Sequence, residues 1–147
     1  MSVWPNGCFA ETHALVTGGT SGIGLAIAAA FLNEGAIVTA TGVSLEEVAS
    51  AAQSMPGLRT AVLDVRSAAD IESLVTSLPS LHHVVNCAGI IKRGAEHDPE
   101  VFADVIDINL TGAWRMVRAV VPQMIAQGQG GRIVHVASVA GHVGTPG

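Results

Sequence analysis

The chain has 147 residues, of which 49% are hydrophobic and 13% are charged, and its formal net charge is −5. This length predicts a single domain over residues 1–147, and so apolar a composition argues against intrinsic disorder. The acidic balance argues against nucleic acid as a partner, and because no apolar run approaches the ~18 residues that cross a bilayer, we expect a cytoplasmic protein that binds no membrane.

Short apolar runs of strand length alternate along the chain with stretches of helical period. The runs are rich in β-branched residues and nearly continuous, which is typical of strands covered on both faces. The predicted strands cover residues 14–16, 36–40, 60–63, 84–85 and 133–137, and the predicted helices cover residues 21–33, 45–55, 68–78, 99–107 and 109–127. The alternation predicts an α/β fold, a doubly wound Rossmann-type parallel sheet of five strands with flanking helices.

A glycine-rich turn joins the first predicted strand to the first predicted helix. Its glycines let the backbone approach a pyrophosphate, and the helix that follows offers free N–H groups and a partial positive charge. No Lys or Arg precedes Arg59, so backbone groups must hold any anion in this half. The alternative is a plain turn between a strand and a helix. The expected contacts with a dinucleotide are Gly18, Thr20, Ser21, Gly22, Ile23 and Gly24.

The last predicted helix carries a regular apolar face that we expect to pack on the sheet. Met116 and Ala119 lie off that face, so they indicate either a second buried surface, for example against another subunit, or a wider stripe against the sheet. Pro122 should kink this helix, and the glycines from Gly128 onward should end it. The expected face consists of Leu110, Ala113, Trp114, Val117, Val120, Val121, Met124 and Ile125.

Several motifs follow the glycine turn in a familiar order. The turn has the spacing Gly-x-x-x-Gly-x-Gly, and the later motifs are Leu63-Asp64-Val65, Asn86-Cys87-Ala88-Gly89, Asn109 and Ser138. In this order the chain resembles the short-chain dehydrogenase/reductase family, classical type, along essentially its whole length. The resemblance implies an NAD(P)-dependent oxidoreductase that moves a hydride between nicotinamide and an alcohol or carbonyl substrate.

The motifs after the third and fourth strands are expected to contact the cofactor. Asp64 and Val65 lie at the carboxyl end of a strand, where ligands bind in open α/β sheets, and the Asp64 carboxylate can accept a hydrogen bond from an adenine amine. Asn86, Ala88 and Gly89 should leave room for the nicotinamide ribose. The alternatives are a turn carboxylate in the first case and a simple strand-ending turn in the second.

The resemblance also assigns catalytic roles to two residues. Ser138 would hydrogen-bond the substrate oxygen, and Asn109 would hold a water of the proton relay at a local helix irregularity. The alternatives are a capping serine and an ordinary helix N-cap. In the family, the proton donor is a tyrosine some way beyond this serine, followed by a lysine. The chain has no Tyr and ends at Gly147, so we expect a truncated enzyme that is inactive as it stands.

The choice between NAD and NADP depends on the end of the second strand. An acid ~20 residues beyond the glycines would bind the ribose 2′-hydroxyl of NAD, but the strand ends Ala40-Thr41-Gly42-Val43-Ser44 without one. The 2′-phosphate of NADP would need a Lys or Arg near Ser21 or Thr41, and neither is there. We therefore favour NAD over NADP, with Thr41 among the contacts.

The remaining features indicate partners only in outline. Lys92 and Arg93 could meet an acidic substrate or lie in a solvated loop, and this stretch faintly resembles family members that act on sugar acids. The expected partners are a small-molecule substrate and, from the resemblance, further copies in a dimer or tetramer. No metal site is expected, because the histidines lack ligand spacing. The alternative to an enzyme is a non-catalytic dinucleotide-binding module or regulatory subunit.

Overall fold

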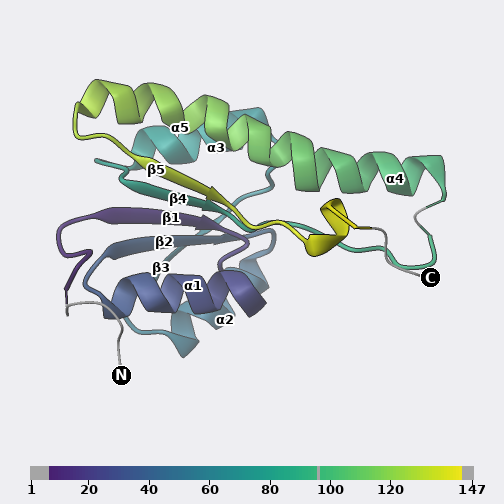
Figure 1. Ribbon diagram of the computed structural model, residues 1–147. Coiled ribbons are helices and arrows are strands. Elements are labelled where there is room, and N and C mark those ends of the chain that lie inside the picture. Colours follow the sequence, from purple (N-terminus) through teal and green to yellow (C-terminus); the bar gives the residue numbers. More distant parts are fainter. Residues whose placement is uncertain (1–6, 96, 144–147) are drawn as a thin grey trace.

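The computed structural model describes residues 7–95 and 97–143 (Figure 1). Five parallel strands form one sheet in the order β3-β2-β1-β4-β5, with β1 in the centre. Their bounds are β1 His13–Thr17, β2 Ile37–Gly42, β3 Arg59–Val62, β4 His83–Asn86 and β5 Arg132–His135. The chain winds outward from β1 to β3 and then returns to the other side of β1. This reversal places a topological switch point between β1 and β4, where open α/β sheets bind ligands.

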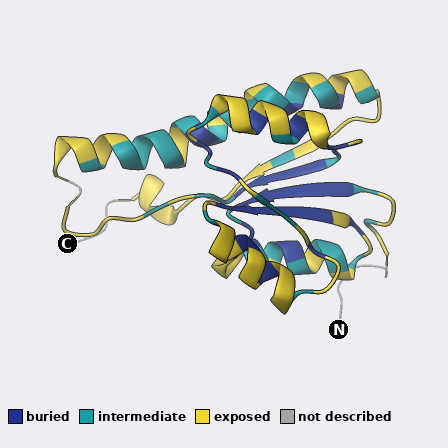
Figure 2. Ribbon diagram, turned by 180° about the vertical axis from the view of Figure 1, so that it is seen from behind, coloured by how far each residue is buried: buried dark blue, intermediate teal, exposed yellow. Residues whose placement is uncertain are grey.

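Helices cover both faces of the sheet, as predicted for a doubly wound fold (Figure 1). One face packs on α1 (Gly22–Asn33) and α2 (Leu45–Ser54), and the other packs on α3 (Ala68–Ser77) and α5 (Ala113–Gln127). Side chains alternate along β1, so Val16 joins the first core and Leu15 joins the second. Figure 2 shows the central strands buried, while the edge strand β5 is largely exposed.

The helices after β4 form one continuous rod rather than two separate helices. Asp98 caps α4 (Pro99–Ile106) by accepting hydrogen bonds from the backbone N–H groups of Glu100 and Val101. A π-helical segment, η1 (Asp107–Gly112), then carries the chain into α5, which runs past Pro122 and ends at Gly128 with a φ of 67°. The prediction of a break near residue 108 is therefore wrong, because the extra residue of a π turn is absorbed without ending the helix.

The face of α5 that meets the core agrees only in part with the expected one, because Val120 and Met124 were predicted to pack there and Met116 was not assigned to that face. Met116, Val120 and Met124 are buried against α3 and the sheet, whereas Trp114 and Ile125 are more than half exposed. The expectation that Leu110, Trp114 and Ile125 pack on the sheet is wrong. Met116 and Ala119 both meet the main core, as the alternative of a wider stripe predicted. Apolar residues surround much of this helix, so their spacing alone could not identify the buried stripe.

Candidate functional site

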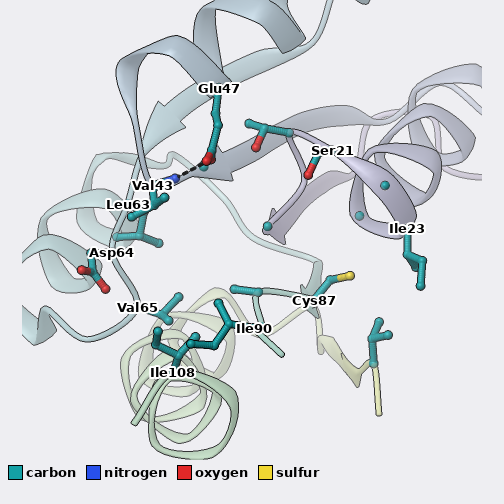
Figure 3. A pocket seen from close by; sticks show the side chains of 18 of the residues that line it. Ser21, Ile23, Val43, Glu47, Leu63, Asp64, Val65, Cys87, Ile90 and Ile108 are labelled. Atoms are coloured by element: carbon teal, nitrogen blue, oxygen red, sulfur yellow. Dashed lines mark hydrogen bonds between the residues drawn. The ribbon is translucent and has the colours of Figure 1, made fainter. Parts of the chain in front are cut away.

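A cavity of about 450 Å³ opens at the carboxyl edge of the sheet (Figure 3). Its walls come from the turns that follow β1, β2, β3 and β4, so it spans the switch point between β1 and β4. Most of the predicted cofactor contacts lie in these walls. They are Gly18, Thr20, Ser21, Gly22, Ile23, Gly24, Asp64, Val65, Ala88 and Gly89.

The glycine turn packs tightly against the turn after β4. Gly18 has a φ of +63°, and a Cβ at this position would lie 2.8 Å from the Cα of Ala88. A Cβ on Gly24 would collide with the carbonyl group of Gly18. Glycine is therefore required at both positions by backbone contact. This packing brings the N-terminus of α1 to the wall of the cavity.

The start of α1 offers unpaired hydrogen-bond donors to the cavity. Ser21 is the N-cap, and its hydroxyl accepts no hydrogen bond from the helix backbone. The first intrahelical bond runs from the N–H of Leu25 to the carbonyl of Ser21, so the N–H groups of the preceding turn have no helical partner. Because the helix dipole adds a partial positive charge here, this end of the cavity suits a phosphate.

Thr17, which we did not predict as a site residue, fixes the floor of the cavity. Its buried Oγ1 accepts hydrogen bonds from the N–H groups of Cys87 and Ala88, each at 3.2 Å. The threonine of the glycine motif is thus the side chain that holds the turns after β1 and β4 together. Its position just before the glycines was the available sequence signal.

Asp64 lies at the opposite end of the cavity and is bound by Arg66. The guanidinium donates to both carboxylate oxygens, with Nη2 2.7 Å from Oδ2, and also reaches Asp104 at 2.9 Å. The hydrogen bonds from the Arg66 side chain hold the pKa of Asp64 below its usual value. An adenine amine would therefore have to share an ionised carboxylate with Arg66.

The Asn109 side chain forms two hydrogen bonds with the backbone of Ile90. Its Oδ1 accepts from the Ile90 N–H at 2.8 Å, and its Nδ2 donates to the Ile90 carbonyl at 2.9 Å. Asn109 lies inside the π-helical segment, which confirms the expected helix irregularity and excludes the N-cap alternative. Its side chain holds the turn after β4 in place, so a relay water would have to be bound by the backbone carbonyl.

A second cavity, of about 910 Å³, adjoins the first along Cys87, Ala88, Gly89 and Ile90. Asn86, Asn109, His135 and Ser138 also line it. Ser138 caps a short 3-10 turn, η2 (Val139–Gly141), by accepting a hydrogen bond from the N–H of Ala140 at 3.2 Å. The hydroxyl keeps its own proton for donation.

Asn86 presents an unpaired acceptor beside this second cavity. Its Nδ2 lies 3.3 Å from Nδ1 of His135, and its buried Oδ1 has no hydrogen-bond partner among the described residues. An unpaired buried oxygen is costly, and this one is shielded from the cavity that other atoms of Asn86 line. Cys87 lines both cavities, and burial raises the pKa of its thiol, which keeps it neutral.

Thr41 is the one predicted contact that the structure places away from both cavities. Its side chain is buried in β2, and only its carbonyl approaches the site, where it accepts a hydrogen bond from the N–H of Gly19 at 3.0 Å. In the part of the chain that the structure describes, no group of three or more His, Cys, Asp or Glu side chains could hold a metal ion. Within the same residues, no helix has the length and apolarity to span a membrane.

Comparisons with known proteins agree with this geometry. A family model described as short chain dehydrogenase matches residues 12–147. The chain is 37% identical over 138 residues to a sorbitol dehydrogenase of Cereibacter sphaeroides, covering 89% of this chain and 54% of the relative. It is 35% identical over 153 residues to the 2-dehydro-3-deoxy-L-rhamnonate dehydrogenase (NAD(+)) of Sphingomonas sp. (strain SKA58), covering 99% of this chain and 61% of the relative.

A solved structure has a similar fold. The short-chain type dehydrogenase/reductase from Mycobacterium ulcerans matches 90% of this chain and 53% of its own chain, with a TM-score of 0.83 and 28% sequence identity. The chain thus spans about half the length of the relatives it matches. The family model covers residues 12–147, which is nearly the whole chain. The chain belongs to the short-chain dehydrogenase/reductase family.

Proposed function

We propose that the protein is an NAD-dependent oxidoreductase that transfers a hydride between nicotinamide and the carbinol or carbonyl carbon of a small substrate. The observation that carries this proposal is the junction of the two cavities along Cys87–Ile90. A dinucleotide with its phosphates at α1 and its adenine near Asp64 would extend past Ala88 and Gly89 into the second cavity. There it would meet Asn86 and Ser138.

The chain's own residues would bind the cofactor, orient the substrate and polarise the substrate oxygen. When bound, the cofactor supplies the hydride acceptor or donor. Asn86, which lines the second cavity next to Ala88 and Gly89, would flank the nicotinamide ribose. Ser138 can donate its proton to the substrate oxygen while it still accepts from Ala140, because a hydroxyl has one donor and two acceptor sites.

We propose further that these 147 residues bind the cofactor without useful turnover. The resemblance gives proton transfer to a tyrosine, and the chain contains none. General acid-base groups typically contribute about 10²- to 10⁴-fold to the rate. Ser138 and Asn109 alone would therefore leave a slow reaction.

The charges around the cavity support NAD rather than NADP. Arg66 is the one cation that lines the first cavity among the described residues, and Asp64 and Asp104 already neutralise it. A 2′-phosphate would find no free partner. One relative carries NAD(+) in its name. Several relatives are named for sugar alcohols or sugar acids, so we propose a small polyhydroxy or hydroxy-acid substrate.

Calorimetric titration with NAD tests this proposal. We expect saturable binding of one NAD per chain, and we expect Gly18→Ala to weaken it at least tenfold, because the added Cβ meets Ala88 and the φ is positive. Gly141→Ala is the matched control, since a Cβ there has no neighbour within 4 Å. If folded wild-type protein shows no NAD binding, or if both variants bind like wild type, the proposal is wrong.

A further inference from the structure

The end of β2 has no acidic side chain of its own, and it has no space for one. A Cβ at Gly42 would lie 2.6 Å from Oγ1 of Thr20 and 2.7 Å from Oε2 of Glu47. Any side chain at this position would therefore displace one of these two groups. The space that a strand-end acid would use is already occupied by the carboxylate of Glu47, which reaches it from the first turn of α2.

Glu47 is held in this position by the backbone around it. The N–H of Val43 donates to Oε2 of Glu47 at 2.9 Å (Figure 3). The Glu47 N–H donates to Oγ of Ser44 at 3.2 Å. These two bonds form a helix cap and need only one carboxylate oxygen. Oε1 accepts no hydrogen bond from the described residues, and Glu47 lines the first cavity.

Glu47 lies between two walls of the first cavity. On one side lies Thr20, within the glycine turn that leads to the N-terminus of α1. On the other side, the N–H of Leu63 donates to the carbonyl of Gly42 at 2.8 Å, which brings the Leu63–Asp64 segment alongside. A nucleotide with phosphate at α1 and adenine at Asp64 must place its ribose between these two walls.

The acidic side chains of the cavity favour a hydroxyl over a phosphate next to Glu47. Glu47 and Asp64 are the acids that line the cavity in the described part of the chain, and Arg66 is bound to Asp64 at 2.7 Å. A carboxylate accepts hydrogen bonds from ribose hydroxyls but repels a phosphate dianion.

We infer that Glu47, rather than a residue of β2, binds the adenosine ribose hydroxyls and excludes the 2′-phosphate of NADP. This inference rests on the proposed binding of a dinucleotide. It assigns the cofactor preference to a helix residue whose carboxylate occupies the place of the missing strand-end acid.

Dissociation constants for NAD and NADP, measured by calorimetry on wild type, Glu47→Gln and Glu46→Gln, test the inference. Gln keeps an acceptor for the Val43 N–H, so the cap should survive, and thermal unfolding checks this. Glu46→Gln removes the same charge from the neighbouring position, and Glu46 does not line the cavity. We expect wild type to prefer NAD at least tenfold, Glu47→Gln to reduce this preference at least tenfold, and Glu46→Gln to retain it.

The outcomes separate this inference from the proposed function. If wild type binds NAD and the ratio of the two dissociation constants stays within twofold in Glu47→Gln, the inference is overturned and the proposed function stands. An equal change in Glu46→Gln would also overturn it, because net charge rather than the position of Glu47 would then set the preference. If wild type binds neither nucleotide, both fail.

Discussion

Two side chains hold the turn after β4 from opposite sides. The Thr17 hydroxyl accepts hydrogen bonds from the N–H groups of Cys87 and Ala88. The Asn109 side chain forms hydrogen bonds with the N–H and the carbonyl of Ile90. Both side chains bind backbone groups of the turn, so they fix its shape whatever side chains the turn itself carries. This explains how the wall shared by the two cavities stays in place.

The Thr17 hydroxyl is expected to contribute measurably to stability. In Thr17→Val, two N–H groups in partly buried hydrogen bonds lose their acceptor, and each costs less than the upper end of the about 1–3 kcal/mol of a fully buried unsatisfied group. We predict a loss of about 2–4 kcal/mol in the free energy of unfolding by urea, together with weaker NAD binding. Thr17→Ser retains the hydroxyl and should recover most of both. A valine variant as stable as wild type would show that these hydrogen bonds contribute nothing.

Buried histidines at the amino end of the sheet should make stability depend on pH. Burial lowers the pKa of His13 and His83 from the usual 6.5. Below pH 6.5 the unfolded chain therefore binds protons that the folded chain does not. The free energy of unfolding keeps its full value above pH 6.5. It falls as the pH drops toward the lowered pKa values, by up to about 1.4 kcal/mol per pH unit for each histidine.

Urea unfolding at pH 7.5 and 5.5 measures this dependence. His83 packs on the rings of Phe9 and Phe31, with centroids 5.1 and 5.4 Å away. His83→Phe should therefore fold and show a smaller loss at pH 5.5. Equal stability at the two pH values would contradict the assignment of these histidines as neutral in the folded state.

At the scale of elements, the sequence was sufficient for the strands and insufficient for the long helix. The β-branched runs lie in or beside all five strands, because strands covered on both faces must be continuously apolar. The resemblance anticipated an irregularity at Asn109, but the composition of residues 107–112 did not show that the helix continues through it, because a π turn and a helix end look alike in sequence. The buried stripe of α5 was predicted only in part, because apolar residues occur on several sides of this helix.

Met116 distinguishes the observed packing of α5 from the expected one. It is fully buried in the core, whereas Ile125 on the same helix is 73% exposed. Met116→Ala should lower the free energy of unfolding by about 2–5 kcal/mol, and Ile125→Ala should change it by less than about 1 kcal/mol. Urea unfolding in dilute solution compares the two. The reverse order would indicate that α5 is rotated relative to the sheet.

At the scale of the whole molecule, the site is assembled from turns that lie far apart in the sequence. The glycine turn, Asp64, Asn86 and Ser138 could be identified from sequence because each ends or follows a strand, and the carboxyl ends of parallel strands share one edge. Glu47 could not be identified in this way. It lies 23 residues after Gly24, close to the ~20 of the dinucleotide pattern, but its place in the first turn of a helix suggests only a cap.

We also propose that the protein associates with itself through the rod formed by α4, η1 and α5. Phe102, Leu110 and Trp114 expose large apolar side chains along it, and exposed apolar patches often mark interfaces. Light scattering should give a mass of at least two chains for wild type and a lower mass for Phe102→Glu. Leu45→Glu, at an exposed leucine of α2, should leave the mass unchanged. A monomeric wild type would contradict the proposal.

The most direct test of the central claim is a crystal structure of the protein with NAD. We predict pyrophosphate oxygens within about 3.2 Å of N–H groups at the start of α1. We also predict the adenine beside Asp64, the adenosine ribose beside Glu47, and the nicotinamide between Asn86 and Ser138. NAD bound away from the glycine turn, or reversed so that its adenine lies at Ser138, would contradict this binding mode.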